Sequence, residues 1–254
     1  MEQTEDRLKT LLISQNFPNT ETVDSVLENA KSLSRCFVEV TDGIAVLSDF
    51  KKHVCYTFSG KFGMMVFNMP GYSMDGQSPF EDNIFNNISK EDLLERHILE
   101  LRFFHFIMTV PVKERRDYQM SCIVRMSNSD GSMMPVLHNS RYIRSLENGA
   151  VWLALCTYQP LPILDIGTHS GVFNTSTGKP VNTQDYTSGD SKLLSKRQTE
   201  ILSLLAKGEA SKQIADRLNI SVHTVNRHRQ DILAALKVSN TASAVEIALR
   251  LRLI

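Results

Sequence analysis

The chain has 254 residues, of which 42% are apolar and 22% are charged. This length fits one large domain or two ordinary ones, and two is the better expectation because single cores stop growing efficiently beyond about 250 residues. The near-average composition excludes wholesale disorder and a fibrous repeat. The 28 basic and 28 acidic residues give a net charge of zero. A chain that binds nucleic acid along its whole length would be basic, so this balance argues against that class of protein.

The N-terminal sequence does not have the character of a targeting segment. MEQTEDRLKTLL begins with acids and lacks the basic start and the long apolar run of a signal peptide. No stretch approaches the ~18 uninterrupted apolar residues of a transmembrane helix. We therefore expect a cytoplasmic protein that makes no contact with a membrane.

The four cysteines, Cys36, Cys55, Cys122 and Cys156, are widely spaced. They form no C-x-x-C pair and no Cys/His cluster with the spacing of zinc ligands. Each lies in an apolar or strand-like context, where a free thiol behaves as a small hydrophobic side chain. The sequence predicts four buried thiols and no metal site, with a redox or metal role as the alternative.

Two amphipathic helices are predicted in residues 1–35, the first over about 4–17 and the second after Pro18. Either Asn19 or Thr20 can cap the second helix. Two such helices at the start of a chain pack on their own domain or, alternatively, form the seam of a dimer.

From residue 36 the sequence pattern changes from helical periodicity to that of strands. FVEVTDGIAVLSD and HVCYTFSG, separated by the polar Lys51 and Lys52, predict an opening hairpin. A long helix is predicted from Ser89 to about Phe106. Asp92 follows Ser89 by three residues, as in a capping box, and apolar residues then recur at helical spacing.

Three antiparallel strands are predicted next. DYQMSCIVRM alternates between apolar and polar residues, Asp130 and Gly131 form the turn into MMPVLHNSRYI, and the apolar run AVWLALCTY follows Asn148 and Gly149. GVFNTSTGKPV predicts a further small hairpin. Residues 182–191 are polar and without periodicity, and we interpret them as a linker between two domains.

Two strands, an interrupted helical region, one long helix and a three-stranded meander follow one another in the order of a PAS domain. Residues 38–158 resemble a PAS-type sensor domain: ISKEDLLERH stands where many such domains carry an HPDD-like helix start, and SNSDGS lies at their usual hairpin. Ser89 and Lys90 replace the usual His-Pro pair. The resemblance implies a PAS-like sensor domain over residues 36–181 that holds haem, flavin, a small metabolite or nothing.

Few residues in this region are candidates for holding a bound group. His97 and His105 are weak haem-ligand candidates, and a histidine on an apolar helix face is more often a core residue. A group of apolar residues either lines a small-ligand pocket or belongs to the core. Its members are Phe62, Met64, Met65, Phe67 and Met69. No cofactor is predicted, while a small ligand of unknown identity stays possible.

Charge is unevenly distributed along the chain. Residues 192–254 carry eleven Lys and Arg against five Asp and Glu, a net charge of +6, which leaves −6 for residues 1–191. A basic domain can bind phosphate, whereas the acidic remainder is repelled by DNA. The distribution therefore indicates a nucleic-acid-binding domain over residues 192–254.

Capping signals mark the first two helices of this segment. Ser195, with Gln198 three residues later, forms a capping box, and Gly208 ends the helix. Ser211 can cap the second helix.

A helix-turn-helix is predicted from the next signals. The corner Asn219-Ile220 leaves room only for a sharp turn, and Ser221 with Thr224 starts the third helix. A fourth helix begins near Asn240.

A helical wheel assigns the faces of the third helix. Val225, Ile232 and Leu236 cluster on one side and are predicted to be its core face. The opposite face carries residue types that read base edges in the major groove, with arginine directed to guanine and asparagine or glutamine to adenine. A merely solvated surface is the alternative, and Arg227 and Asp231 can also pair with each other. The opposite and flanking residues are His223, Thr224, Asn226, Arg227, Gln230, Asp231 and Ala234.

Residues 194–250 resemble the LuxR/FixJ-type helix-turn-helix family through LSKRQTEIL, KG, KQIADRLNIS, HTVNRHRQDILAAL and KVSN, in order and without a gap. The resemblance implies a four-helix DNA-binding domain that dimerises through its last helix, with phosphate contacts from Lys212 and Thr224. The chain departs from the family at Ala210, Asn226 and Thr241. The resemblance also gives His228 a structural or phosphate-adjacent role.

These features predict an α+β chain with a PAS-like antiparallel sheet and flanking helices, followed by an all-α four-helix helix-turn-helix domain. No receiver-domain acids, acyl-homoserine-lactone pocket pattern, nucleophile-base pair or phosphate loop is found, and no enzyme activity is expected. The predicted function is that of a one-component transcription regulator that binds double-stranded DNA as a homodimer. The alternative is a protein-interaction module whose DNA binding is secondary. The predicted DNA-binding residues are Lys212, His223, Thr224, Asn226, Arg227, Arg229 and Gln230.

Overall fold

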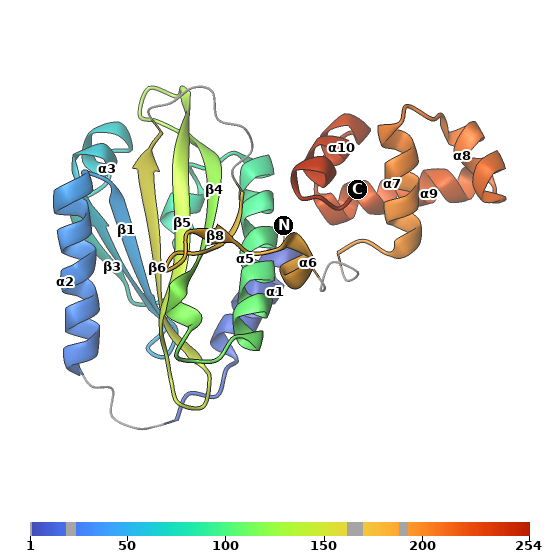
Figure 1. Ribbon diagram of the computed structural model, residues 1–254. Coiled ribbons are helices and arrows are strands. Elements are labelled where there is room, and N and C mark those ends of the chain that lie inside the picture. The colour runs from blue at the N-terminus through green and yellow to red at the C-terminus, as the bar shows by residue number, and fades with distance from the viewer. Residues whose placement is uncertain (1, 19–23, 162–169, 188–192) are drawn as a thin grey trace.

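The computed structural model describes residues 2–18, 24–161, 170–187 and 193–254 (Figure 1). Its helices are α1 (Glu2–Ile13), α2 (Asp24–Thr41), α3 (Lys61–Val66), α4 (Asp82–Phe85), α5 (Lys90–Thr109), α6 (Thr183–Thr187), α7 (Lys196–Ala206), α8 (Ser211–Leu218), α9 (Val222–Leu236) and α10 (Thr241–Arg250). Its strands are β1 (Ile44–Asp49), β2 (Val54–Ser59), β3 (Tyr72–Asp75), β4 (Tyr118–Ser127), β5 (Met133–Ser145), β6 (Val151–Pro160), β7 (Gly171–Asn174) and β8 (Lys179–Pro180).

The molecule has two parts, which we call the sheet domain (described residues up to Thr187) and the C-terminal domain (residues 193–254). In the sheet domain, α2 covers one face of the sheet, while α5 and α1 lie on the other (Figure 1). The C-terminal domain consists of α7 to α10 and lies beside α5. The mixed α and β composition agrees with the predicted fold class.

The described strands form one antiparallel sheet in the order β3-β2-β1-β6-β5-β4-β7-β8. The β1–β2 hairpin and the β4–β5–β6 meander meet in the middle, where Val46 pairs with Cys156. At this junction, strands that are neighbours in the sheet are distant in the sequence, because β6 pairs with β1. The predicted opening hairpin, meander and small β7–β8 hairpin are confirmed as elements.

The predicted start of the first strand at residue 36 is wrong. Helix α2 continues to Thr41, and β1 begins only at Ile44. Val38 lies on the same buried helix face as Leu27, so the helical period outweighs the local alternation of FVEV. The predicted caps Asn19 and Thr20 lie outside the described residues.

Strand β4 alternates as predicted, with four side chains that face the core and are no more than 1% exposed; these are Met120, Cys122, Val124 and Met126. Three of the four cysteines are buried, but Cys36 is exposed, so the prediction of four buried thiols is wrong there. Cys36 lies on the outer surface of α2. Because residue 36 was predicted to start a strand, its side chain was expected to face the core.

The predicted linker at 182–191 contains the short helix α6. Tyr186 is buried and belongs to the main apolar cluster of the sheet domain, so 183–187 is attached to that domain. The segment was predicted to be a linker because its other residues are mostly polar, and the one aromatic residue, Tyr186, gave no periodic pattern. Residues 188–191 lie outside the described part.

Helix α5 connects the two parts of the molecule. Ser89 caps it by accepting a hydrogen bond from the Asp92 backbone N–H, as predicted, and the helix runs to Thr109 and not to Phe106. Most of its side chains are buried because it has the sheet on one side and α10 on another. No single helix in the described ranges is long and apolar enough to cross a membrane.

Candidate nucleic-acid interface

A sharp corner separates α8 from α9. Asn219 has φ +51°, a left-handed conformation that asparagine tolerates better than most residues, and it ends α8. Ser221 then caps α9, and its hydroxyl accepts a hydrogen bond from the Thr224 backbone N–H at 3.0 Å. The two-residue turn and the cap therefore produce the predicted helix-turn-helix geometry.

The predicted core face of α9 is confirmed. Val225, Ile232 and Leu236 are at most 1% exposed and pack with residues of α7, α8 and α10. The remaining surface of α9 is thereby presented outwards. Four of the predicted contact residues are exposed on it: His223, Asn226, Arg227 and Gln230.

Arg227 and Asp231 do not form the alternative i,i+4 pair. Neither side chain makes an ion pair or a hydrogen bond with another described residue, and both are exposed. The Arg227 guanidinium therefore keeps all its donors for a ligand. A bidentate contact with guanine O6 and N7 needs two of them.

Arg229 differs from the exposed residues because it is held inside the domain. It is half-buried and donates hydrogen bonds to the Ser211 hydroxyl at 2.8 Å and to the Thr241 hydroxyl at 3.0 Å. Ser211 in turn donates to the Asn226 side-chain oxygen at 3.0 Å. The relay links α8, α9 and α10 and fixes the orientation of Asn226.

The predicted cap of α8 at Ser211 is wrong. Ala210 is the N-cap and has no hydroxyl, while Ser211 lies inside the helix and its hydroxyl serves the relay to Asn226. The Gln213 side chain compensates in part by accepting a hydrogen bond from the Ala210 backbone N–H at 2.8 Å.

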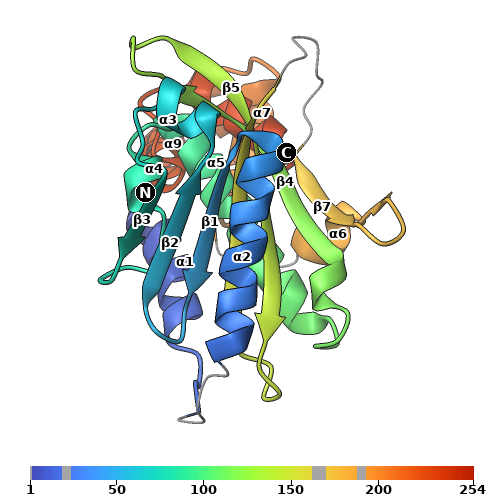
Figure 2. The ribbon, with the colours of Figure 1, turned by 90° about the vertical axis from the view of Figure 1, so that its left-hand side faces the viewer.

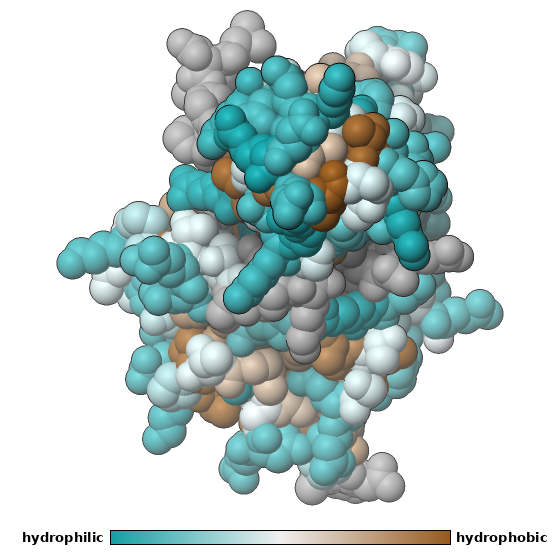
Figure 3. Space-filling view, turned by 90° about the vertical axis from the view of Figure 1, so that its right-hand side faces the viewer, coloured by the Kyte–Doolittle hydropathy of each residue, from teal (hydrophilic) through white to brown (hydrophobic). Residues whose placement is uncertain are grey.

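The two predicted phosphate contacts lie at helix starts. Lys212 is exposed in the first turn of α8, and Thr224 is half-buried in the first turn of α9. Backbone N–H groups and the positive end of the dipole favour an anion at both places. The side of the molecule that carries the C-terminal domain is mostly hydrophilic (Figure 3).

The C-terminal domain shares an apolar cluster with the sheet domain. Leu94 and Ile98 of α5 are buried in the same cluster as Leu251, which follows α10. Arg102, also on α5, donates a hydrogen bond to the Leu251 carbonyl oxygen at 2.9 Å. The end of α10 is thus held against α5 by both apolar and polar contacts.

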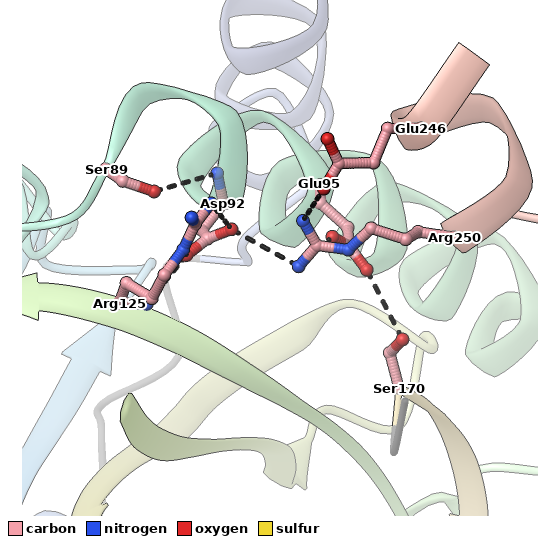
Figure 4. A network of polar contacts seen from close by, with 7 residues as sticks. All are labelled: Ser89, Asp92, Glu95, Arg125, Ser170, Glu246 and Arg250. Carbon is pink, nitrogen blue, oxygen red and sulfur yellow. Dashed lines mark hydrogen bonds and ion pairs between the residues drawn. The ribbon is translucent and has the colours of Figure 1, made fainter. Parts of the chain in front are cut away.

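Beside this cluster, Arg250 of α10 forms ion pairs with two carboxylates of α5 (Figure 4). Its Nη2 lies 3.3 Å from Asp92 Oδ1 and 3.0 Å from Glu95 Oε2. Burial alone raises the pKa of Asp92, but hydrogen bonds and the charge of Arg125 outweigh burial and lower it. Burial raises the pKa of Glu95, and the charge of Arg250 opposes that rise.

A second charged cluster lies inside the sheet domain, where sequence reasoning assigned no function. Arg96 is fully enclosed and pairs with Glu81 and with Glu100, the latter at 3.1 Å. Tyr158 donates its hydroxyl to Glu81 at 2.6 Å, and Arg96 Nε donates to His138 Nε2 at 3.1 Å. Charged residues on a helix usually indicate a solvated face, so no sequence signal marked this cluster.

The cavity at this cluster is small, about 20 Å³, which is room for about one water molecule. His97 lies on its wall, with its ring edge against Phe85. Burial and the charge of Arg96 lower the pKa of both His97 and His138 well below the usual value for histidine. The described residues contain no group of three or more potential metal ligands.

The apolar group proposed as a pocket lining is divided. Phe62 is buried, Met64 and Met65 are exposed, and Phe67 and Met69 line a pocket of about 540 Å³. That pocket is bordered by β2, β3 and α4 at the surface of the sheet domain.

Residues 192–248 match the family model described as bacterial regulatory proteins of the luxR family. The oxygen regulatory protein NreC of Staphylococcus carnosus (strain TM300) is 39% identical over 82 residues, which cover 32% of this chain and 36% of that protein. NreC of Staphylococcus aureus (strain bovine RF122 / ET3-1) is 32% identical over 136 residues, which cover 52% of this chain and 63% of that protein. The chain thus spans less than two thirds of these relatives.

Among solved structures, the Vibrio cholerae VqmA dimer in the absence of target DNA matches 88% of this chain and 86% of its own, with 14% identity and a TM-score of 0.32. Escherichia coli SdiA matches 98% of both chains, with 15% identity and a TM-score of 0.27. TM-scores this low carry no conclusion about this chain.

The matched family and the curated relatives are described as regulatory proteins, the class of protein expected for this chain. The matched segment contains α7, α8, the Asn219 corner and α9, with its core and capping contacts in place. Residues 192–248 are therefore a helix-turn-helix domain of the luxR family.

Proposed function

We propose that the chain is a one-component transcription regulator that binds double-stranded DNA sequence-specifically. The observation that carries the proposal is the exposed face of α9, which lies opposite a buried core face within a luxR-family domain. The net charge of +6 in residues 192–254 adds attraction to phosphate regardless of sequence.

Each predicted contact residue has a distinct role in this proposal. Arg227 reads guanine, and Asn226 and Gln230 read adenine, while His223 lies at the start of the same face. Lys212 and Thr224 bind phosphates and fix the docking of the domain. Arg229, also among the predicted DNA-binding residues, contributes in this proposal by positioning Asn226 through Ser211.

The sheet domain is proposed to be the sensor. Its element order is that of a PAS-like domain, and we assign this sensor role to the sheet domain, which includes α2 and α6 and precedes the DNA-binding domain in 192–254. Helix α5 supports a coupling between the two, since Arg96 points into the sheet domain and Asp92 contacts Arg250. A ligand or partner that shifts α5 would change how α10 and the attached α9 are held.

The regulator acts as a homodimer in the cytoplasm. Two copies present two α9 helices to the half-sites of one operator, and spacing between the copies selects the spacing between half-sites. A small-molecule ligand of the sensor domain is consistent with this scheme.

The test is a fluorescence-anisotropy titration of the full chain with labelled duplexes covering the region upstream of its own gene, and with a random-sequence duplex. Binding should weaken steeply between low and moderate salt because counterions are released. Arg227→Ala should lose about 1–3 kcal/mol of specific affinity. Lys212→Ala should weaken both duplexes alike.

Arg116→Ala removes an exposed arginine from the sheet domain and is the matched control, expected to bind as the parent chain does. Lack of any DNA affinity at low salt would overturn the proposal. The alternative, an interaction module with secondary DNA binding, predicts that Arg227→Ala and Lys212→Ala leave the regulatory output in cells intact.

A further inference from the structure

Helix α2 has two packing faces, of which only one is covered. Its buried face consists of Leu27, Ala30, Ser34 and Val38, which lie against the outer face of the sheet. Lys31 and Arg35 flank this face on the β2 side, over the rings of Tyr56 and Phe58.

A second stripe runs along the exposed side of α2. Its members alternate in steps of three and four residues, the spacing of a seam between two packed helices. Leu33 is 64% exposed and Val40 is 85% exposed, and both lie on one face of the helix and are not scattered singly over the surface. The stripe consists of Asn29, Leu33, Cys36 and Val40, all of them exposed, whereas Val26 is half-buried and packs against the cluster under α2.

A groove follows this stripe along the sheet. It has a volume of about 480 Å³ and lies between α2 and the uncovered outer faces of β4, β5 and β6. Figure 2 shows α2 crossing the sheet with β4 and β7 uncovered beside it. Apolar wall residues include Phe37, Ile143 and Leu155, while Arg141 and Arg144 lie on the sheet side.

We propose that the exposed stripe of α2 and the adjoining groove form the dimer interface, with α2 of a second copy lying antiparallel in the groove. This inference rests on the homodimer of the proposed function and names its surface. One chain supplies both the helix stripe and the groove that receives it, as a two-fold interface requires.

Charge complementarity selects the antiparallel orientation. Glu39 is exposed at the end of α2 that leads into β1, and it has no ion pair with another described residue. Arg144 lies at the opposite end of the groove, where β5 pairs with Leu153. A second copy turned by 180° brings its Glu39 to the end where Arg144 lies, whereas a parallel copy leaves the two charges apart.

The test measures the mass of the full chain by analytical ultracentrifugation over a range of concentrations without DNA. Leu33→Asp and Val40→Asp should each raise the dimer dissociation constant at least tenfold. Met65→Asp is the matched control, since Met65 is 76% exposed on α3, and it should leave the constant unchanged. Circular dichroism of each variant confirms that the chain is folded.

A charge swap tests the orientation. Glu39→Arg and Arg144→Glu should each weaken the dimer, and the double variant should restore it. Among the four cysteines, all within the described ranges, only Cys36 is exposed, so a short bis-maleimide reagent should cross-link the dimer through it. Cys36→Ser should abolish that product.

Three outcomes overturn the inference. The first is a chain that stays monomeric, which leaves its DNA affinity to be judged separately by the anisotropy titration. The second is a dimer that tolerates Leu33→Asp and Val40→Asp but dissociates with Leu249→Asp on α10, where Leu249 is 56% exposed. The third is a charge-swapped double variant that is weaker than either single variant.

Discussion

Charged side chains have opposite surroundings in the two domains. In the sheet domain, Arg96, Glu81 and Glu100 are no more than 6% exposed and contact one another. In the C-terminal domain, Arg227 and Lys212 are exposed and make no ion pair or hydrogen bond with another residue that the structure describes. Charged residues therefore have two roles in this chain. The buried ones form ion pairs that stabilise the interior of the sheet domain, and the exposed basic ones can bind an anion such as a DNA phosphate.

The largest effect is expected from breaking the buried cluster. Arg96→Ala leaves Glu81 and Glu100 as uncompensated buried carboxyls, and removal of one partner of a buried pair costs about 3–5 kcal/mol. Denaturant unfolding followed by the fluorescence of Trp152 measures this, because the only tryptophan is buried in β6. Arg116→Ala is the exposed control, and an equal loss in both variants would contradict the comparison.

A pH dependence should follow from the buried histidines. The lowered pKa of His97 in the folded state means that its stabilising contribution is complete above the unfolded pKa of about 6.5 and is lost as pH falls below it. The raised pKa values of Glu95 and Glu100 act in the opposite direction, since they favour the folded state as pH falls.

Comparison with His97→Phe isolates the histidine. Below pH 6.5 the parent chain should lose stability relative to the variant by up to about 1.4 kcal/mol per pH unit, and the difference should be constant above pH 7.5. The readout is the Trp152 unfolding midpoint at a series of pH values. Parallel curves for the two proteins at all pH values would show that the pKa of His97 is the same in the folded and unfolded states, which contradicts the expected lowering.

Arg250→Ala tests the contact between the domains. Without Arg250, Asp92 still pairs with Arg125, but Glu95 loses the arginine that balances its charge. We expect the free energy of unfolding to fall by about 1 kcal/mol, a small value because Arg250 is partly exposed. Small-angle X-ray scattering should show a larger radius of gyration. Lys207→Ala, which removes an exposed charge from the same domain, should leave the scattering unchanged.

The smallest expected effect is a gain. Ala210→Ser supplies the hydroxyl that the N-cap of α8 lacks, and this should stabilise the C-terminal domain by about 0.5–1 kcal/mol. Thermal unfolding followed by far-ultraviolet circular dichroism measures the change. Ser195→Ala, which removes the hydroxyl of the capping box at α7, should shift the midpoint in the opposite direction.

Local signals were sufficient for the C-terminal domain. The caps at Ser195 and Ser221, the start of the fourth helix near Asn240 and the core face of α9 follow from spacing within single helices, and all are confirmed. The roles of Ser211 and Arg229 did not follow, because their partners come from other helices.

Long-range contacts explain what the sequence could not predict in the sheet domain. Arg96 and Glu81 meet across 15 residues, and Arg250 reaches Asp92 across 158. The strand prediction at residue 36 failed because burial of Val38 against the sheet decides the helical conformation. The four-residue pattern FVEV does not indicate which face of the segment will be covered by a sheet whose strands are distant in the sequence.

The position of Leu94 and Ile98 in the apolar cluster of the C-terminal domain has a consequence for cooperativity. Melting either domain exposes apolar surface that belongs to the other, so the two should unfold in one cooperative calorimetric transition and not in two independent ones. A chain cut at the linker would leave Leu251 uncovered, and the isolated domain should melt at a lower temperature than it does in the whole chain. Stability and communication between the domains thus depend on the same few side chains.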